Sequence, residues 1–360
     1  AYCQEFAQAM GGGYADAVNS GTNAVYVAVR ALEVEPFTEV IVPPMTDAGG
    51  IMPVPLCNLI PVPADSMPGS YNMGPDEIEA RITPQTSAII VAHIGGVPAP
   101  MGPIMEIAKA RGLKVVEDCA QAHGAKYRGR FLGAWGHVGA FSTMFGKHHA
   151  TGGQGGVVYT RDKDLFQKIR WYSDRGKPFG LPAGTGNVVA ALNCNLNDLS
   201  ACIGRVQLKR LPGMVAARRK SALWLAEQCK TLKSVRVIAD PPHGETSFWF
   251  IFLRLDLDKI RVDKAAFVKA LAAEGVPAEA TYSGPVTDSP WYKERAVFGK
   301  TGYPWACPLY KGDPKKEYAL PNFLASMNTI FRINHHEKVG VAKMREVFAA
   351  LRKVEAAYLK

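Results

Sequence analysis

Three polar segments of the sequence have the residue types of a reaction centre. Lys147 lies in FSTMFGKHHATGGQGGVVYT, which starts at residue 141 and runs through a glycine-rich bend into an apolar stretch. Asp118 ends the apolar run KVVED, where a carboxylate needs a cation or hydrogen bonds to offset its burial. Residues 19–24, NSGTNA, precede a helical pattern, and the backbone N–H groups at a helix start bind phosphate.

Each segment alone has an ordinary interpretation: a solvated lysine, a hydrogen-bonded structural aspartate and a plain helix N-cap. Together they match pyridoxal phosphate (PLP), which needs an amine for a Schiff base, an anion beside its pyridinium nitrogen and a cup for its phosphate. The aspartate would keep that nitrogen protonated, and the lysine would later move a proton between carbon atoms. No GxGxxG pattern follows a strand, which disfavours a dinucleotide site.

The histidines offer a competing interpretation as metal ligands. His148 and His149 are adjacent, but His93, His123 and His137 are dispersed and form no helical i,i+4 pair. We therefore predict no metal site. His93 ends an apolar run, so it is a candidate substrate contact, although a hydrogen-bonded structural role fits it equally well.

The elements that must position these residues are short apolar runs alternating with helical patterns over the first two hundred residues. The runs lie at residues 40–42, 87–93, 114–118 and 155–160. This alternation predicts an α/β fold with a mostly parallel central sheet flanked by helices. The carboxyl ends of its strands would share one rim, where such proteins bind ligands.

A second, smaller α/β unit is predicted after the first. A helical stretch from residue 198 to about 230, broken near Pro212, precedes a clear strand at 247–255. We therefore expect a large PLP-binding domain over residues 1–210 and a small C-terminal domain over residues 211–360.

Composition narrows the class of protein. The chain has 360 residues, of which 48% are hydrophobic and 21% charged, as in ordinary globular proteins. No apolar run reaches the roughly 18 to 20 residues that cross a membrane. The net charge of +10 is dispersed, which disfavours nucleic acid and suits phosphorylated small molecules. The seven cysteines are scattered without a CxxC pair, so we expect a reducing, cytoplasmic location.

Five motifs follow one another in the order SGTNA, VIVPPMTD, VVEDCAQAHGA, FSTMFGKHHATGGQGGVVYT and NCNLNDLSACIGRVQLKRL. In these motifs the chain resembles the DegT/DnrJ/StrS family of sugar aminotransferases, which have the type I fold of PLP enzymes. The resemblance is strongest from about residue 88 to 210. It implies a homodimer with shared active sites, in addition to the two-domain fold expected above.

The resemblance also implies roles for individual residues. Lys147 corresponds to the lysine that forms the internal aldimine, and Asp118 to the partner of the pyridinium nitrogen. The other implied cofactor-binding positions are Gly21, Thr22 and Ser142 for the phosphate, Gln121 for the ring, and Asn193 for the phosphate of the neighbouring subunit.

The chain departs from the family pattern at three places. Asp47 replaces an aromatic residue that often stacks on the cofactor ring, so stacking is weaker or supplied elsewhere, and Asp47 becomes a candidate substrate contact. Asn195 replaces a common arginine. Counting forward from Phe141 puts the catalytic lysine at Lys147, whereas counting back from the glycine bend puts His148 there. A histidine at that place is typical of related sugar dehydratases, so His148 is also a candidate substrate residue.

We favour Lys147, because an insertion in a glycine-rich bend costs little. The expected activity is transfer of an amino group from glutamate or glutamine to a keto sugar, usually nucleotide-linked in the family, with pyridoxamine phosphate (PMP) as the intermediate form of the cofactor. The alternatives are a PMP-dependent sugar 3-dehydratase that uses His148, an aminotransferase for a cyclitol ketone, and a non-catalytic binding protein.

Overall fold

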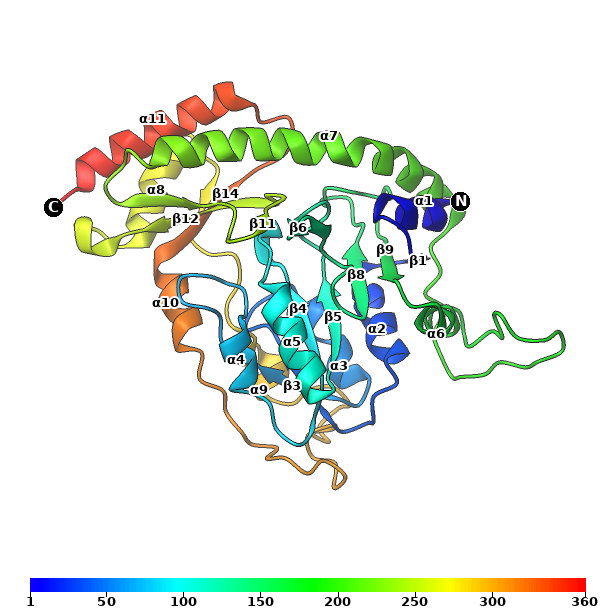
Figure 1. The fold of residues 1–360 in the computed structure, drawn as a ribbon. Helices are drawn as coiled ribbons and strands as arrows, with labels where there is room; N and C mark the ends of the chain where they lie inside the picture. Colours follow the sequence, from blue (N-terminus) through cyan, green and yellow to red (C-terminus); the bar gives the residue numbers. More distant parts are fainter.

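The computed structural model describes all of residues 1–360 and contains a large α/β unit and a smaller one (Figure 1). The large unit is built on a seven-stranded sheet of order β1-β9-β8-β5-β4-β2-β3. Its strands are β1 Tyr14–Val18, β2 Glu39–Val42, β3 Ile60–Pro63, β4 Thr86–Ala92, β5 Lys114–Asp118, β8 Val138–Ser142 and β9 Gly156–Thr160. Neighbours from β3 to β8 are parallel, and β9 is antiparallel to both β8 and β1. The predicted mostly parallel sheet is confirmed.

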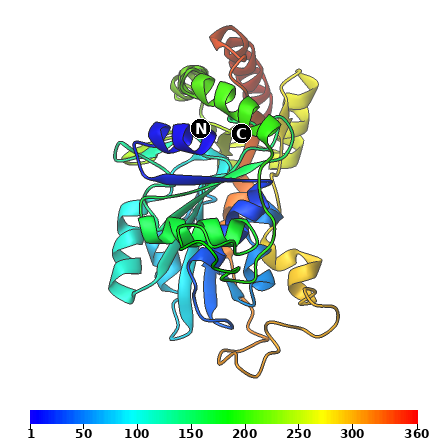
Figure 2. The same cartoon turned by 90° about the vertical axis from the view of Figure 1, so that its right-hand side faces the viewer.

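Helices cover both faces of this sheet, as Figure 2 shows. One face packs on α2 (Gly21–Ala31), α3 (Pro53–Leu56) and α6 (Lys163–Ser173) through a core of 28 buried residues. The other packs on α1 (Tyr2–Ala9), α4 (Pro75–Glu79) and α5 (Met101–Arg111) through a core of 26. Strands covered on both sides need to be apolar throughout, which is why they read as continuous apolar runs rather than alternating ones.

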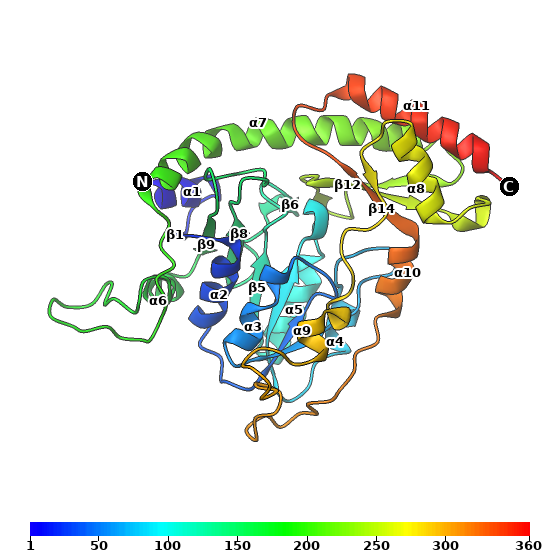
Figure 3. The ribbon, with the colours of Figure 1, turned by 180° about the vertical axis from the view of Figure 1, so that it is seen from behind.

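The small unit is a four-stranded antiparallel sheet of order β10-β12-β14-β13, visible from behind in Figure 3. Its strands are β10 Val235–Ile238, β12 Phe250–Leu255, β13 Ala278–Glu279 and β14 Ile330–Asn334. Its helices α8 (Lys264–Ala273) and α11 (Val341–Tyr358) share a buried core with the second half of α7 (Asp198–Cys229).

Helix α7 runs without interruption along both units (Figure 1), so the predicted break near Pro212 is wrong. Proline removes one backbone N–H donor from a helix. Here Leu208 and Val215, on either side of the proline, are buried, and Pro212 itself is exposed. Tertiary packing therefore holds the helix together across the missing hydrogen bond. The boundary expected at residues 210–211 falls inside this helix.

Part of the segment after residue 211 packs on the large unit. The predicted domain boundary at residues 210–211 did not include this contact. Val286, Tyr292 and Trp305 belong to the core beside α2 and α3. The Tyr310 hydroxyl donates to Glu39 Oε1 at 2.8 Å. The segment contains η4 (Val286–Asp288) and α9 (Pro290–Lys293), and α10 (Pro321–Thr329) leads back to β14.

The remaining elements are small. A three-stranded sheet of order β11-β6-β7 joins the two units at their border, and η1 and η2 follow β2 and β4. The bounds are β6 Lys126–Tyr127, β7 Arg130–Phe131, β11 Gly244–Glu245, η1 Ala48–Gly50, η2 Ile94–Gly96 and η3 Leu257–Lys259. None of the helices combines the length and the apolar character that spanning a bilayer requires.

Candidate active site

The predicted site residues gather at the carboxyl ends of the central strands. Asp118 is the last residue of β5 and Ser142 the last residue of β8. Gly21 is the first residue of α2, and the loop after β2 runs through Asp47 to Gly50. Parallel strands end at one rim, and this rim is where α/β proteins bind ligands.

Two glycines allow these segments to approach closely. A Cβ added to Gly21 would lie 2.6 Å from Ser142 Cβ, and one added to Gly50 would lie 2.6 Å from Asp118 Oδ2. Real Cβ atoms do not tolerate such distances. The start of α2 therefore lies directly against the end of β8, and the loop after β2 lies against the carboxylate of Asp118.

The start of α2 has the properties of a phosphate-binding site. Ser20 Oγ caps the helix by accepting from the N–H of Asn23 at 3.0 Å. The N–H groups of Gly21 and Thr22 have no acceptor within the chain, as expected for the first positions of a helix. With the Ser142 hydroxyl beside them, these groups are donors arranged to bind an anion.

Asp118 is buried, with 6% of its surface exposed. Its Oδ1 accepts from the N–H of Ala120 at 3.0 Å. Burial raises the pKa of the Asp118 carboxyl, and the Ala120 hydrogen bond and the charge of Lys147 offset this only in part. A carboxylate in this position gains stability from a protonated ring nitrogen placed next to it.

Lys147 lies in the bend that follows β8, and its charge acts on Asp118 and Asp47. Its Nζ is 3.8 Å from the centroid of the Trp249 ring. Burial lowers the pKa of the Lys147 amine, and the two carboxylates oppose this shift. A lowered pKa increases the fraction of neutral amine, which is the nucleophilic form.

His148 and His149 anchor this bend to other parts of the chain. His148 is 3% exposed, and its Nε2 lies 3.2 Å from the carbonyl of Ser247. His149 is fully buried, and its Nε2 lies 2.6 Å from the Tyr2 hydroxyl. Burial lowers the pKa of both imidazoles, so both are neutral at physiological pH. Of the two candidates for the lysine position, Lys147 is the one whose charge acts on Asp118.

Gln121 has both ends of its amide occupied by protein groups. Its Oε1 accepts from the N–H of Gly95 at 2.7 Å, and its Nε2 donates to the Tyr282 hydroxyl at 2.8 Å. These bonds fix the amide plane at the site wall. Tyr282 and Trp249 come from the smaller unit and were not identified as site residues from the sequence, in which Trp249 belongs to the predicted strand 247–255.

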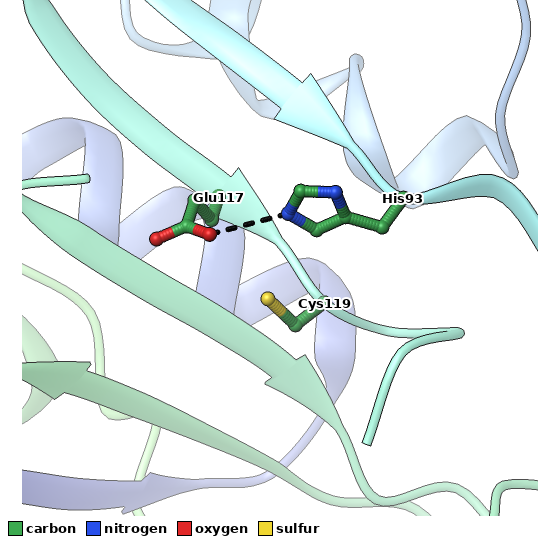
Figure 4. Close-up of side chains that lie close together, drawn as sticks. All are labelled: His93, Glu117 and Cys119. Carbon is green, nitrogen blue, oxygen red and sulfur yellow. Dashed lines mark hydrogen bonds and ion pairs between the residues drawn. The ribbon is translucent and has the colours of Figure 1, made fainter. Parts of the chain in front are cut away.

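His93 has a structural set of partners instead of a free face toward the site (Figure 4). Its Nε2 lies 3.2 Å from Glu117 Oε2, and its Nδ1 accepts from the N–H of Ala99 at 3.2 Å. Both ring nitrogens are used, so none is left for a substrate. Together with Cys119 these side chains form a cluster of metal-type ligands. The carboxylate of Glu117, however, already receives three backbone N–H groups.

Two further predicted residues are exposed. Asp47 caps η1, with its Oδ1 accepting from the N–H of Gly49 at 3.2 Å. Asn193 Oδ1 accepts from the N–H of Asn195 at 3.2 Å. No hydrogen bond links Asn193 to the phosphate-binding residues of its own chain.

A methyl group at residue 21 is expected to damage the site. In Gly21→Ala the new Cβ would press on Ser142, so we expect the free energy of unfolding to fall by about 1–3 kcal/mol and PLP binding to weaken at least about tenfold. Chemical denaturation and a PLP titration measure the two effects. Gly213→Ala is the matched control: its Cβ meets nothing within 4 Å in α7, and it is expected to be neutral or slightly stabilising. Equal behaviour of the two variants would contradict the close approach.

The donor set as a whole fits PLP. The chain provides an amine with a lowered pKa, a buried carboxylate of which one oxygen accepts no hydrogen bond from the chain, and helix-start N–H groups next to a hydroxyl. These are the three groups that the cofactor requires.

Comparison with known proteins agrees with this geometry. The model of the DegT/DnrJ/EryC1/StrS aminotransferase family matches residues 1–352. GDP-perosamine synthase of Caulobacter vibrioides is 33% identical over 285 residues, which are 77% of this chain and 74% of that protein. UDP-N-acetyl-3-dehydro-alpha-D-glucosamine 3-aminotransferase of Acidithiobacillus ferrooxidans is 32% identical over 324 residues, 88% and 83% of the two chains.

The fold agrees as well. The crystal structure of an aminotransferase from Psychrobacter cryohalolentis is 28% identical and superposes with a TM-score of 0.85 over 99% of this chain and 90% of that one. The type I fold and the enzyme class, an aminotransferase, are thus confirmed, and the family is PLP-dependent. The chain belongs to the DegT/DnrJ/EryC1/StrS aminotransferase family.

Proposed function

We propose that this protein is a PLP-dependent aminotransferase that moves an amino group from glutamate or glutamine to a nucleotide-linked keto sugar. The observation that carries the proposal is the convergence at the strand ends of Asp118, the start of α2 with its open N–H groups, and the bend that carries Lys147, whose charge acts on Asp118. An amine that can form a Schiff base, an anion and a phosphate-binding site in one place match PLP better than any other cofactor.

Each residue has a defined part in this reaction. The N–H groups of Gly21 and Thr22 and the Ser142 hydroxyl would hold the phosphate, and Asp118 would keep the ring nitrogen protonated. PLP, when bound, supplies an electron sink that stabilises negative charge on the substrate carbon. Lys147 would be the covalent anchor, and its Nζ would carry the proton that moves between carbon atoms in the reaction.

The acceptor class rests on relatives and on charge. The two curated relatives described above are named for GDP- and UDP-linked amino sugars. The net charge of +10 attracts a doubly phosphorylated acceptor of this kind. The dehydratase alternative needs a histidine in place of the lysine, and the burial of His148 against Ser247 argues against it.

The test is a two-step assay with PLP-loaded protein. Glutamate alone should yield one 2-oxoglutarate per active site, and a keto sugar nucleotide should then receive the amino group. Loss of a sugar hydroxyl without 2-oxoglutarate would favour the dehydratase. Absence of any PLP binding would overturn the proposal in favour of a binding protein.

We also propose that the chain acts as a homodimer, with Asn193 reaching the phosphate bound by the partner subunit. Apolar side chains are exposed at helical spacing on α7, where Leu199, Ile203 and Val206 are 80%, 43% and 60% exposed. Leu192, 56% exposed, and Phe145, 72% exposed near Lys147, are further apolar surface. Exposed apolar side chains that recur along one helix are typical of a protein interface.

Sedimentation should therefore give twice the 39.0 kDa of the chain. Leu199→Glu is expected to yield monomers and to reduce amino transfer at least about tenfold, because a charge at an interface core is costly. Leu324→Glu, at a leucine on α10 that is 48% exposed, serves as the control and should remain dimeric. A wild-type chain that sediments as an active monomer would contradict the shared site.

A further inference from the structure

Trp249 brings an aromatic ring from the small unit onto the lysine of the large unit. It immediately precedes β12, and its ring centroid lies 3.8 Å from Lys147 Nζ. Its indole N–H donates to the carbonyl of Gly146 at 3.3 Å. The tryptophan is thus tied both to the bend and to the amine that the bend carries.

Two further aromatic rings pack near the Trp249 ring. The Phe250 ring lies with its centroid 4.3 Å away at 36°, and the Tyr282 ring lies 6.3 Å away at 85°. Tyr282 in turn receives the hydrogen bond from Gln121. Trp249 itself remains half-buried. A partly exposed ring held in place by neighbouring rings is a surface on which a planar group packs at little cost in side-chain entropy.

Residue 47, where the resemblance implies a ring that stacks on the cofactor, is not aromatic in this chain. Position 47, in the loop after β2, holds a carboxylate that is exposed and caps Gly49. An aspartate does not stack on an aromatic ring. The group that becomes attached to Lys147 must come within bonding distance of its Nζ, and Trp249 is the aromatic side chain whose ring packs on that atom.

We propose, on the basis of the proposed function, that Trp249 packs against the bound cofactor and provides the aromatic contact that residue 47 does not. Trp249 is then a cofactor-binding residue supplied by the small unit. The cofactor consequently bridges the two units, with its phosphate on α2 and its ring against the start of β12.

The experiment measures the affinity for PMP, which binds without a covalent bond and so reports packing separately from Lys147. Trp249→Leu is expected to raise the Kd three- to tenfold, the effect of losing an aromatic contact. Trp249→Phe keeps a ring and should stay within about twofold of wild type. The matched control is Trp291→Leu, at a half-buried tryptophan on α9 beside the lower part of the large unit (Figure 3).

Fluorescence gives a second readout, since PMP should quench wild-type emission and the quenched fraction should fall in Trp249→Phe. If Trp249→Leu binds PMP as tightly as wild type, the inference is overturned. If Trp249→Phe is weakened as much as Trp249→Leu, the hydrogen bond to Gly146 and not the ring is responsible, which also overturns it. Failure of the wild type itself to bind PMP would instead overturn the proposed function.

Discussion

Lys147→Ala is expected to reduce amino transfer by at least about 10³-fold while leaving PMP bound. The amine is both the covalent anchor and the proton carrier of the proposed reaction, and removal of a general acid–base group alone costs about 10²–10⁴-fold. The rate of 2-oxoglutarate formation measures the loss. The PMP titration verifies that the cup at α2 and the carboxylate of Asp118 are still assembled.

Covalent labelling distinguishes this lysine from every other residue. Borohydride added to the PLP-loaded wild type should fix the cofactor on the peptide that carries Lys147, and mass spectrometry should find no such adduct in Lys147→Ala. Lys220→Ala, at an exposed lysine of α7, is the control and should be labelled and active like wild type. Normal turnover in Lys147→Ala, or an adduct on another residue, would contradict the assignment.

The same measurement addresses the one-residue ambiguity in the sequence. Counting from either side of the glycine-rich bend left Lys147 and His148 as candidates for one position. The structure separates them by burial: His148 lies against Ser247, and Lys147 lies against Trp249. Adjacent residues in a tight bend point in different directions, and a motif count does not contain that information.

The strands of the large unit could be predicted from the sequence because each is an apolar run ended by a turn. β5 has the bounds expected from the sequence, and β2 differs by one residue. The antiparallel direction of β9 could not be predicted from the sequence, because a strand buried on both faces is apolar whether it is parallel or antiparallel to its neighbours. The continuity of α7 was missed because the packing of Leu208 and Val215, which is tertiary, outweighs the local effect of Pro212.

The residues of the site also fall into those that could be predicted from the sequence and those that could not. Residues close in sequence to a strand end or a helix start were found, because Gly21, Asp118 and Lys147 lie in compact motifs. Trp249 and Tyr282 were not, since only folding brings the small unit to the rim. Glu117 was also missed, although two consecutive carboxylates in a buried strand are a signal. Successive side chains of a strand point to opposite faces, so the two have different surroundings and different tasks.

Because Glu117 and Asp118 have different surroundings, we expect substitutions at these two neighbouring carboxylates to have different effects on stability and on activity. Glu117 accepts from the N–H groups of Gly133, Trp135 and Gly136 and contacts His93. Glu117→Gln replaces one acceptor oxygen by an NH₂ donor facing other donors. We expect the free energy of unfolding to fall by about 3 kcal/mol, measured by chemical denaturation.

Asp118→Asn is expected to reduce activity without destabilising the chain. Amino transfer should fall by about 10²–10⁴-fold, because an amide does not hold the proton of the ring nitrogen in place. Stability of the cofactor-free chain should not fall. Burial raises the pKa of this carboxyl in the folded state, so its contribution to stability is present at acidic pH and is lost as the pH rises through the folded pKa. At neutral pH the burial of this carboxyl is therefore a cost that asparagine removes.

The pH dependence of unfolding separates the two roles further. The stability difference between Asp118→Asn and wild type should favour the variant at neutral pH and shrink toward acidic pH, as the wild-type carboxyl becomes protonated. Asparagine keeps an oxygen for the N–H of Ala120, so that hydrogen bond is not lost. If Asp118→Asn instead unfolds as readily as Glu117→Gln, the carboxylate of Asp118 is a structural group like its neighbour, and its role beside the cofactor has to be abandoned.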